Sequence, residues 1–344
     1  MMSEKLETMS EAVVTVNLEK PVLFDRSDWG CIRLTGADRV RFLHNQTTQN
    51  IEQLSIGKGA HTVFVTSTGR TIDLTTVYVD ETSLLVVTSP GMAQPLYDWM
   101  DRYIFFSDKV TLADESEQTF LFTLLGKGCD EVMTQIGAEA LVGQPEFSHQ
   151  RVTIADAEVM AAAGSDLAVE GYTLWGNRAQ AEDVWQALTT AGALVVSAEQ
   201  WENLRIRQGR PMPGRELTAD DNPLESGLWH SVSFEKGCYI GQETIARLNT
   251  YKGVKKRLWG LGLAQPVGVG EAVWLGDDKI GKVTSLTRDE SGVFGLAYLR
   301  TKAGGEGLVV AVGDRDQTNE RIKANVVALP FVSHEYYVAD EANP

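Results

Sequence analysis

The pattern of apolar residues changes near residue 257, and this change constrains the fold more than any other feature. Beyond it, helical periodicity disappears and short apolar runs recur between glycines. The runs are Leu258–Leu263, Ala272–Leu275, Lys282–Leu286, Val293–Leu299, Leu308–Val312 and Lys323–Leu329. Six short strands at such spacing are typical of a small antiparallel barrel or sandwich. We therefore expect residues 257–344 to form a separate all-β domain.

Residues 1–256 mix strand and helix patterns, which predicts an α+β module. Two alternating runs, Thr62–Thr66 and Thr71–Val79, flank a Ser-Thr-Gly-Arg turn and predict a hairpin. A stripe at helical spacing continues from Leu96 to Ile104 and predicts a helix that starts at Ser89-Pro90.

Further elements of this module follow from the same patterns. We expect strands over 21–35 and 84–88, helices over 38–45, 178–191 and 198–209, and the order strand, helix, strand, strand over 111–176.

Charge and composition exclude several classes of protein. The net charge of −16 argues against broad, nonspecific nucleic-acid binding. The sequence contains no apolar run of 18 or more residues, so it predicts no membrane-spanning helix. The three cysteines lie far apart without a CxxC pair, and the N-terminus resembles neither a secretory signal nor a transit peptide. We expect a monomer in the cytoplasm, with an organellar location only if a targeting peptide is missing.

The common catalytic motifs are absent or incomplete. The segment Gly276–Val283 differs from a P-loop at its last position, because valine offers magnesium no hydroxyl, and we interpret it as a hairpin turn. HExxH and GxSxG do not occur, the five histidines are scattered, and no metal site is expected. A hydrolase or a nucleoside-triphosphate enzyme therefore has little support.

The segment Phe234–Arg247 is the densest unusual part of the chain. In it, Gly237 and Gly241 bracket Cys238, and a helix-compatible stretch follows at once. A thiol near a helix N-terminus and close to Lys236 should have its thiolate favoured and be more nucleophilic. The alternative is a small apolar cysteine in a tight core turn.

Two further features allow a functional or a structural interpretation. Asp73 stands in mid-strand, where it can face solvent, bond to a ligand nitrogen or act as a base. Between Glu202 and Leu258 there are ten basic residues against seven acids. This basic island favours a small anion or a limited RNA contact, or it is a solvated face with chance clustering.

The octamer KGCYIGQE, residues 236–243, closely resembles the K-G-C-[FY]-x-G-Q-E motif of YgfZ-type proteins. These are folate-binding relatives of the glycine cleavage T-protein, associated with maintenance of iron–sulfur enzymes and, in bacteria, with tRNA modification. Weaker similarities to that family follow in the same order along nearly the whole chain. They lie at Leu34–Thr48, Ser67–Asp73, Glu170–Tyr172 and Leu204–Gly209.

The resemblance implies a GcvT-like, three-part architecture. Two interleaved α+β units would surround a central pocket for tetrahydrofolate or a derivative, followed by a C-terminal antiparallel β-barrel. Cys238, absent from the T-protein, would be the functional thiol. The residues implied in folate binding are Asp73, Tyr172, Arg205, Lys236, Gly237, Tyr239, Gly241 and Gln242. A pterin edge bonds to carboxylates, and its glutamate tail bonds to arginine or lysine.

Two positions depart from the T-protein pattern. Thr173 stands where the T-protein typically carries a pterin-binding glutamate, and Asp73 is single where the T-protein has a pair of acids. The leading hypothesis is therefore a folate-dependent accessory protein whose partners are iron–sulfur enzymes or their assembly factors. The alternatives are an aminomethyltransferase of the glycine cleavage type and a tRNA-contacting factor. Whether the protein catalyses a reaction stays open; if it does, folate-dependent one-carbon or aminomethyl transfer is expected.

Overall fold

A computed structural model describes residues 13–313 and 321–336 and divides the chain into two compact units. We call residues 17–197 with 230–242 the sheet unit. The barrel unit comprises residues 198–229 with the described parts of 1–16 and 243–344. The boundary after residue 256 stays a prediction.

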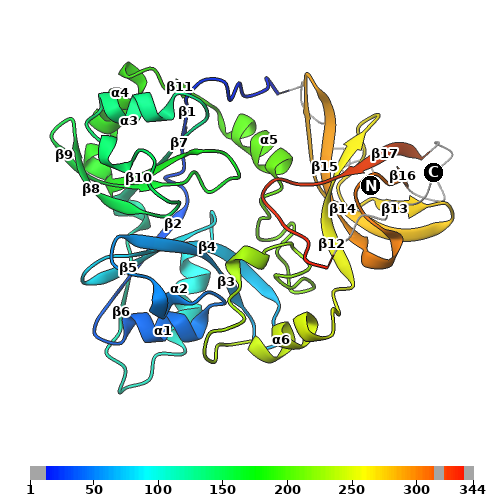
Figure 1. The fold of residues 1–344 in the computed structure, drawn as a ribbon, viewed down its shortest axis with the longest axis horizontal. Coiled ribbons are helices and arrows are strands. Elements are labelled where there is room, and N and C mark those ends of the chain that lie inside the picture. The colour runs from blue at the N-terminus through cyan, green and yellow to red at the C-terminus, as the bar shows by residue number, and fades with distance from the viewer. Residues whose placement is uncertain (1–12, 314–320, 337–344) are drawn as a thin grey trace, which may run out of the picture. The chain divides into compact units, whose positions relative to one another are not determined.

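The sheet unit contains two β-sheets (Figure 1). One has the order β3-β4-β5-β2-β6, and we call it the first sheet. Its strands are β2 (Gly30–Thr35), β3 (Lys58–Val65), β4 (Thr71–Val79), β5 (Ser83–Thr88) and β6 (Thr111–Asp114). The second sheet has the order β11-β1-β7-β10-β9-β8. Its strands are β1 (Val22–Asp25), β7 (Thr119–Leu125), β8 (His149–Ile154), β9 (Ala157–Ala163), β10 (Gly171–Asn177) and β11 (Leu194–Val195).

The two sheets are interleaved along the chain, as expected. The chain starts in the second sheet with β1, passes through the whole first sheet, and returns to the second sheet at β7. The sheets pack face to face through a buried cluster to which both contribute, and Tyr78 of β4 stacks on Trp175 of β10 with ring centroids 4.5 Å apart. Such stacking adds about 1 kcal/mol beyond the area it buries.

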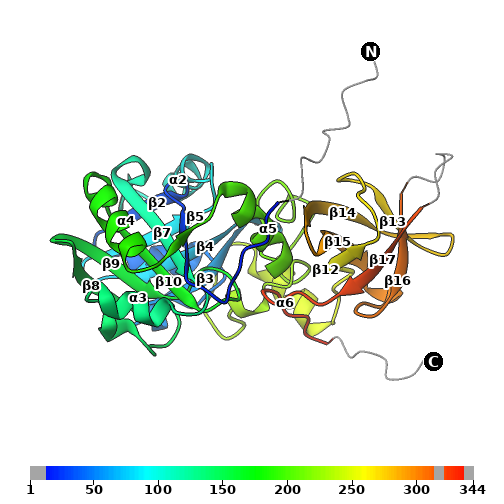
Figure 2. The same cartoon turned by 90° about the horizontal axis from the view of Figure 1, so that it is seen from above.

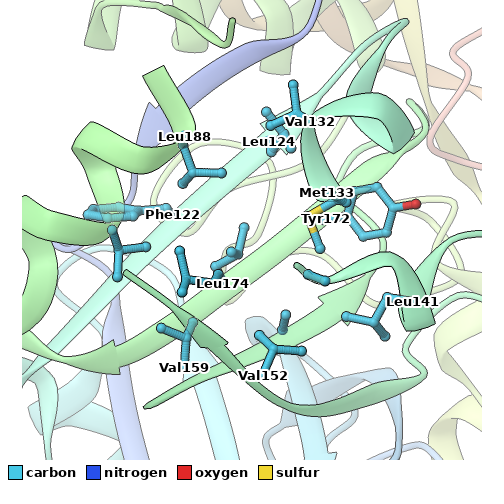
Figure 3. Close-up of a cluster of buried hydrophobic side chains, with 14 of the residues drawn as sticks. Phe122, Leu124, Val132, Met133, Leu141, Val152, Val159, Tyr172, Leu174 and Leu188 are labelled. Carbon is cyan, nitrogen blue, oxygen red and sulfur yellow. The ribbon is translucent and has the colours of Figure 1, made fainter. Parts of the chain in front are cut away.

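Helices cover the outer face of each sheet, which gives four layers. Helices α1 (Arg39–Gln46) and α2 (Ala93–Asp101) share a core with the first sheet. Helices α3 (Cys129–Gln135) and α4 (Ala181–Thr190) share a core with the second sheet. Figure 3 shows this second core, with side chains from β10 pointing toward the helices. Successive side chains of β10 point alternately toward these helices and toward the first sheet, as the side chains of a strand must.

A buried polar cluster lies between the sheets. The Asp166 carboxylate accepts bonds from Arg26 Nη1 at 2.8 Å and Thr76 Oγ1 at 3.2 Å, and lies 2.7 Å from His61 Nε2. Arg26 Nη2 also donates to Thr173 Oγ1 at 3.2 Å. Thr173, which stands where the T-protein typically carries a glutamate, is therefore a partner of a buried arginine.

The barrel unit contains a closed antiparallel barrel of six strands, which confirms the prediction from the apolar runs (Figure 1 and Figure 2). The order is β12-β15-β14-β13-β16-β17. The strands are β12 (Lys256–Leu263), β13 (Ala272–Leu275), β14 (Asp278–Asp289), β15 (Gly292–Arg300), β16 (Val309–Val312) and β17 (Ile322–Val327). Leu275 pairs with Asp278, so Gly276 and Asp277 form the predicted hairpin turn.

Two helices complete the regular structure outside the sheets. They are α5 (Ala198–Gln208) and α6 (Gln242–Thr250), close to the predicted stretches. Short 3-10 helices lie at Ile51–Gln53, Ser116–Gln118, Glu139–Leu141, Arg178–Gln180, Trp229–Ser231 and Thr301–Ala303.

Two predictions of local structure were wrong. Helix α2 begins at Ala93, because Gly91 has a φ of +74°, and it ends at Asp101, although Tyr103 and Ile104 still pack on the core. The spacing of Tyr103 and Ile104 therefore arises from their burial and does not show that the helix continues. The region 111–176 has two strands before its helix and three after it, instead of one and two. The edge strand β6 buries one residue in four, which leaves too little pattern to recognise.

Candidate functional site

The segment Lys236–Gly241 is a loop of the sheet unit that exposes Cys238 to solvent. The other two cysteines, Cys31 and Cys129, are buried, and burial raises the pKa of each thiol to about 12. A thiol reacts as its thiolate and must be accessible. Cys238 is therefore the cysteine that a reagent or a partner can reach without unfolding the protein.

Lys236 fixes the start of this loop by an inward-pointing ammonium group. Its Nζ donates to the carbonyl oxygens of His44, Thr47 and Gln49 at 2.5–2.9 Å, and it lies 4.7 Å from the centroid of the Tyr239 ring. An ammonium has three N–H groups, and here each has one acceptor. The cation also sits at the C-terminal end of α1, where the helix dipole favours positive charge.

Backbone contacts fix the loop on both sides of the cysteine. Ser233 N donates to Thr48 O at 3.0 Å before it, and Ile240 N donates to Asn45 O at 3.1 Å after it. These acceptors follow the end of α1 or belong to it. The thiol thus projects from a loop held at three points against one helix end.

Gly241 brings the loop against the turn between β3 and β4. Its φ is +82°, and a Cβ at this position would lie 2.4 Å from the carbonyl oxygen of Thr66 and 3.1 Å from the Cα of Gly69. Only glycine accommodates both the left-handed backbone and this approach. The next residue, Gln242, is half-buried; its backbone N donates to Tyr239 O at 3.2 Å.

His44 lies beside the loop and was not predicted as a site residue. A Cβ on Gly237 would lie 3.7 Å from its Nε2, while its Nδ1 accepts the N–H of Glu52 at 3.4 Å. Nε2 therefore carries the proton in the neutral ring. Burial, together with nearby Lys236, lowers the pKa of His44. The histidine was missed because its proximity to position 237 depends on tertiary packing.

Asp73 is fully buried on β4, which follows the same turn. Its carboxylate accepts bonds from the backbone N of Ser89 at 2.9 Å and from the Ser89 hydroxyl at 2.6 Å. The acid thus fastens the segment before α2 to the first sheet. A pterin would have to open this contact to reach the carboxylate, and the predicted role of Asp73 in folate binding stays a prediction.

Tyr172 belongs to the other side of the sheet unit. Its ring packs in the core beneath α3 (Figure 3), and its hydroxyl donates to the Asp130 carboxylate at 2.6 Å. It also lines a cavity of about 460 Å³ that includes Asp130, Glu146 and Glu170. Three carboxylates disfavour an anionic ligand. The structure does not bring Tyr172 to the Cys238 loop, and its folate role stays a prediction.

Arg205 lies in α5 of the barrel unit and is buried, with an exposed fraction of 1%. Its guanidinium makes five hydrogen bonds, two to Glu202 and one each to Glu216, the Ser285 hydroxyl and the Arg210 carbonyl. A guanidinium has five N–H groups. A folate carboxylate would have to displace one of these contacts, so the predicted tail-binding role rests on the resemblance alone.

The basic island from Glu202 to Leu258 lies only partly on the surface. Four of its ten cations have exposed fractions of 7% or less; they are Arg205, Arg210, Lys236 and Arg257. Arg207 forms an ion pair with Asp289 at 2.6 Å. The excess of basic residues in the sequence therefore serves packing and internal ion pairs to a large extent.

The described ranges contain neither a candidate metal site nor a candidate membrane-spanning helix. In residues 13–313 and 321–336, no group of three or more histidine, cysteine, aspartate or glutamate side chains is arranged to hold a metal ion. Over the same ranges, no helix has both the length and the apolar character needed to cross a membrane.

Comparison with known proteins identifies the family. A chloroplastic protein of Arabidopsis thaliana, provisionally named a transferase, is 41% identical over 335 residues, which cover 97% of this chain and 74% of the relative. Residues 7–236 match the profile of the GCVT N-terminal domain. The chain belongs to the GCVT N-terminal domain family.

Two aminomethyltransferases are similar to most of the chain, one in sequence and one in fold. An aminomethyltransferase of Bacillus pumilus is 27% identical over 325 residues, covering 91% of this chain and 87% of the relative. The crystal structure of the glycine cleavage system aminomethyltransferase T from Bartonella henselae has a TM-score of 0.78 at 19% identity, covering 94% and 92% of the two chains. The predicted GcvT-like fold is thereby confirmed.

The contact between Gly241 and the β3–β4 turn predicts a large cost for a side chain. We expect Gly241→Ala to lower the free energy of unfolding by about 3 kcal/mol or more, since it adds a backbone collision to a left-handed φ. Gly91→Ala is the matched control, because Gly91 has a φ of +74° but open space around it; the expected loss is about 1 kcal/mol. Equal losses in urea unfolding would show that the loop does not press against the turn.

The buried Lys236 predicts a specific pH dependence. Burial lowers the pKa of Lys236 to about 7, against 10.5 for an ordinary lysine. Between these values the unfolded chain holds the proton more tightly, so this group makes stability rise with pH, by up to about 1.4 kcal/mol per pH unit. Below pH 7 its contribution is constant.

Removing the ammonium tests this assignment. Lys236→Met should abolish that part of the rise in unfolding free energy between pH 7 and 10, measured by urea unfolding at several pH values. The exposed Lys109 serves as control, and Lys109→Met should keep the slope of the parent protein. An unchanged slope in Lys236→Met would contradict a buried, titrating lysine.

Proposed function

We propose that this GCVT-family protein is a YgfZ-type, folate-binding accessory protein that supports iron–sulfur proteins through the thiol of Cys238. The observation that carries this proposal is the exposure of Cys238 on a fixed loop, while Cys31 and Cys129 are buried. A structural cysteine in a tight turn would be expected inside, packed as a small apolar side chain. The iron–sulfur enzymes or assembly factors would be its partners.

The geometry of the loop suits a thiol that acts on a large partner. Lys236 and two backbone hydrogen bonds fix the loop, so Cys238 projects into solvent from a rigid base. Holding a reactive group on a preorganised support lowers the entropy lost when a partner binds. In the described part of the chain no group of metal-ligating side chains surrounds it, so the thiol would serve clusters held by other proteins.

The folate part of the proposal draws support from the family and from the neighbourhood of the loop. Its relatives include aminomethyltransferases, and the resemblance to YgfZ-type proteins implies tetrahydrofolate as the ligand. Gly241 places the loop on the turn that leads into β4 and thus to Asp73. A ligand near this turn would lie close to both the thiol and the acid.

Aminomethyl transfer is the second candidate function. It is favoured by the two aminomethyltransferases, one similar in sequence over most of the chain and one similar in fold. Against it stands Thr173, which donates to Gly164 O at 2.9 Å and accepts from Arg26 where the resemblance leads us to expect an acid. A tRNA-contacting role has less support, because four of the ten cations of the basic island are buried.

The decisive experiment is complementation of a strain that lacks its own protein of this type. We expect Cys238→Ala to fold with an unchanged melting temperature, since the side chain is exposed, yet to lose the restoration of iron–sulfur enzyme activity. Glu235→Ala, which changes an exposed residue directly before the loop, should complement like the parent protein. Full complementation by Cys238→Ala at equal expression would refute the thiol role.

The same variant separates the two candidate functions. Formation of methylene-tetrahydrofolate from an aminomethyl-lipoyl carrier, at equal rates with and without Cys238, would establish aminomethyl transfer instead. The accessory role predicts no such turnover. The cytoplasmic location stays a prediction, since the Arabidopsis relative is described as chloroplastic.

A further inference from the structure

A cavity on the barrel unit gathers cationic side chains that the proposed function does not use. Its volume is about 280 Å³, and its wall comes from β14, β15, the start of β12 and the segment 215–221. Within this wall Lys282 pairs with Tyr298, and Lys256 pairs with Arg300. The barrel hydrogen bonds thus hold these side chains in adjacent positions. The size suits a small ligand rather than a dinucleotide.

The charge of this cavity opposes that of the whole protein. Five cationic side chains line it, Arg215, Lys256, Lys279, Lys282 and Arg300, against the two acids Asp220 and Asp221. The full chain has 31 basic and 47 acidic residues. Gathering like charges in one hollow is unfavourable unless an anion balances them, and such a hollow concentrates anions from solution.

Part of this charge is already balanced and part of it is available. Lys256 Nζ lies 2.6 Å from Asp221 Oδ1 and 4.8 Å from the centroid of the Tyr298 ring, so it is held in place. Arg215 forms an ion pair with Glu202 at 3.0 Å. Lys279, Lys282 and Arg300 are exposed, and among residues 13–313 and 321–336 no carboxylate lies within ion-pair distance of them.

We propose that this cavity binds a small phosphate-bearing ligand with two or more negative charges. The lysines supply point charges and Arg300 a planar fork that matches a phosphate or diphosphate group. The hydroxyl-bearing residues Thr218 and Thr284 also line the wall. The paired Lys256 and Asp221 give the site a fixed edge, while the three exposed cations close on the ligand. The site is independent of Cys238 and of folate binding.

The test is a titration of the full chain with inorganic pyrophosphate, in which isothermal titration calorimetry measures binding at fixed ionic strength. We expect saturable binding, and we expect the double variant Lys282→Gln/Arg300→Gln to weaken it about tenfold or more. Lys323→Gln is the matched control, since Lys323 is an exposed lysine on β17 outside the cavity; it should change the dissociation constant less than about twofold. Both variants alter exposed side chains, so circular dichroism should show an unchanged fold.

Three results would overturn the proposal. They are no saturable binding of pyrophosphate, an equal loss in the control variant, or much tighter binding of a short single-stranded oligonucleotide that the double variant abolishes. The last would assign the cavity to a nucleic-acid backbone. Tetrahydrofolate titrations of the double variant should match those of the parent protein, which keeps failure here distinct from failure of the proposed function.

Discussion

The placement of the cysteine depends on one buried ammonium group. Lys236 inserts its charge at the end of α1 and donates to the carbonyl oxygens of His44, Thr47 and Gln49. A buried carbonyl oxygen that loses its donor costs about 1–3 kcal/mol. The lysine of the KGC motif therefore acts as a buried anchor of the loop, and the cysteine two residues later is exposed.

Buried cations recur in this acidic protein and have a common structural role. Arg26 joins the two sheets through Asp166, and Arg205 joins α5 to the barrel through Glu216 and Ser285. Removing one partner of such a pair leaves a buried charge, which is far more damaging than loss of a surface pair. Other cations are exposed, among them Lys282 and Arg300 on the barrel strands.

The fold could be predicted from the sequence where one periodicity acted alone. The barrel strands and the β3–β4 hairpin follow from alternation, and the octamer together with the weaker motifs indicated the broader GCVT family. The site could be predicted only in part, because burial and partners depend on distant segments. The exposure of Cys238 agrees with an accessible thiol, one of the two interpretations that the sequence left open. Neither the pairing of Asp73 with Ser89 nor the contact of His44 with the loop has a sequence signal. The burial of Arg205 could not be predicted, because a charged side chain is expected at the surface.

The most direct test of the account is whether folate binding protects the exposed thiol. The rate at which 5,5′-dithiobis(2-nitrobenzoic acid) modifies Cys238 would be measured while a stable reduced folate is added, with binding followed in parallel by tryptophan fluorescence. We predict that saturating folate slows the reaction severalfold, with the midpoint equal to the dissociation constant from fluorescence. A thiol that reacts at an unchanged rate in the folate-saturated protein would place the ligand and Cys238 in separate sites and contradict the account.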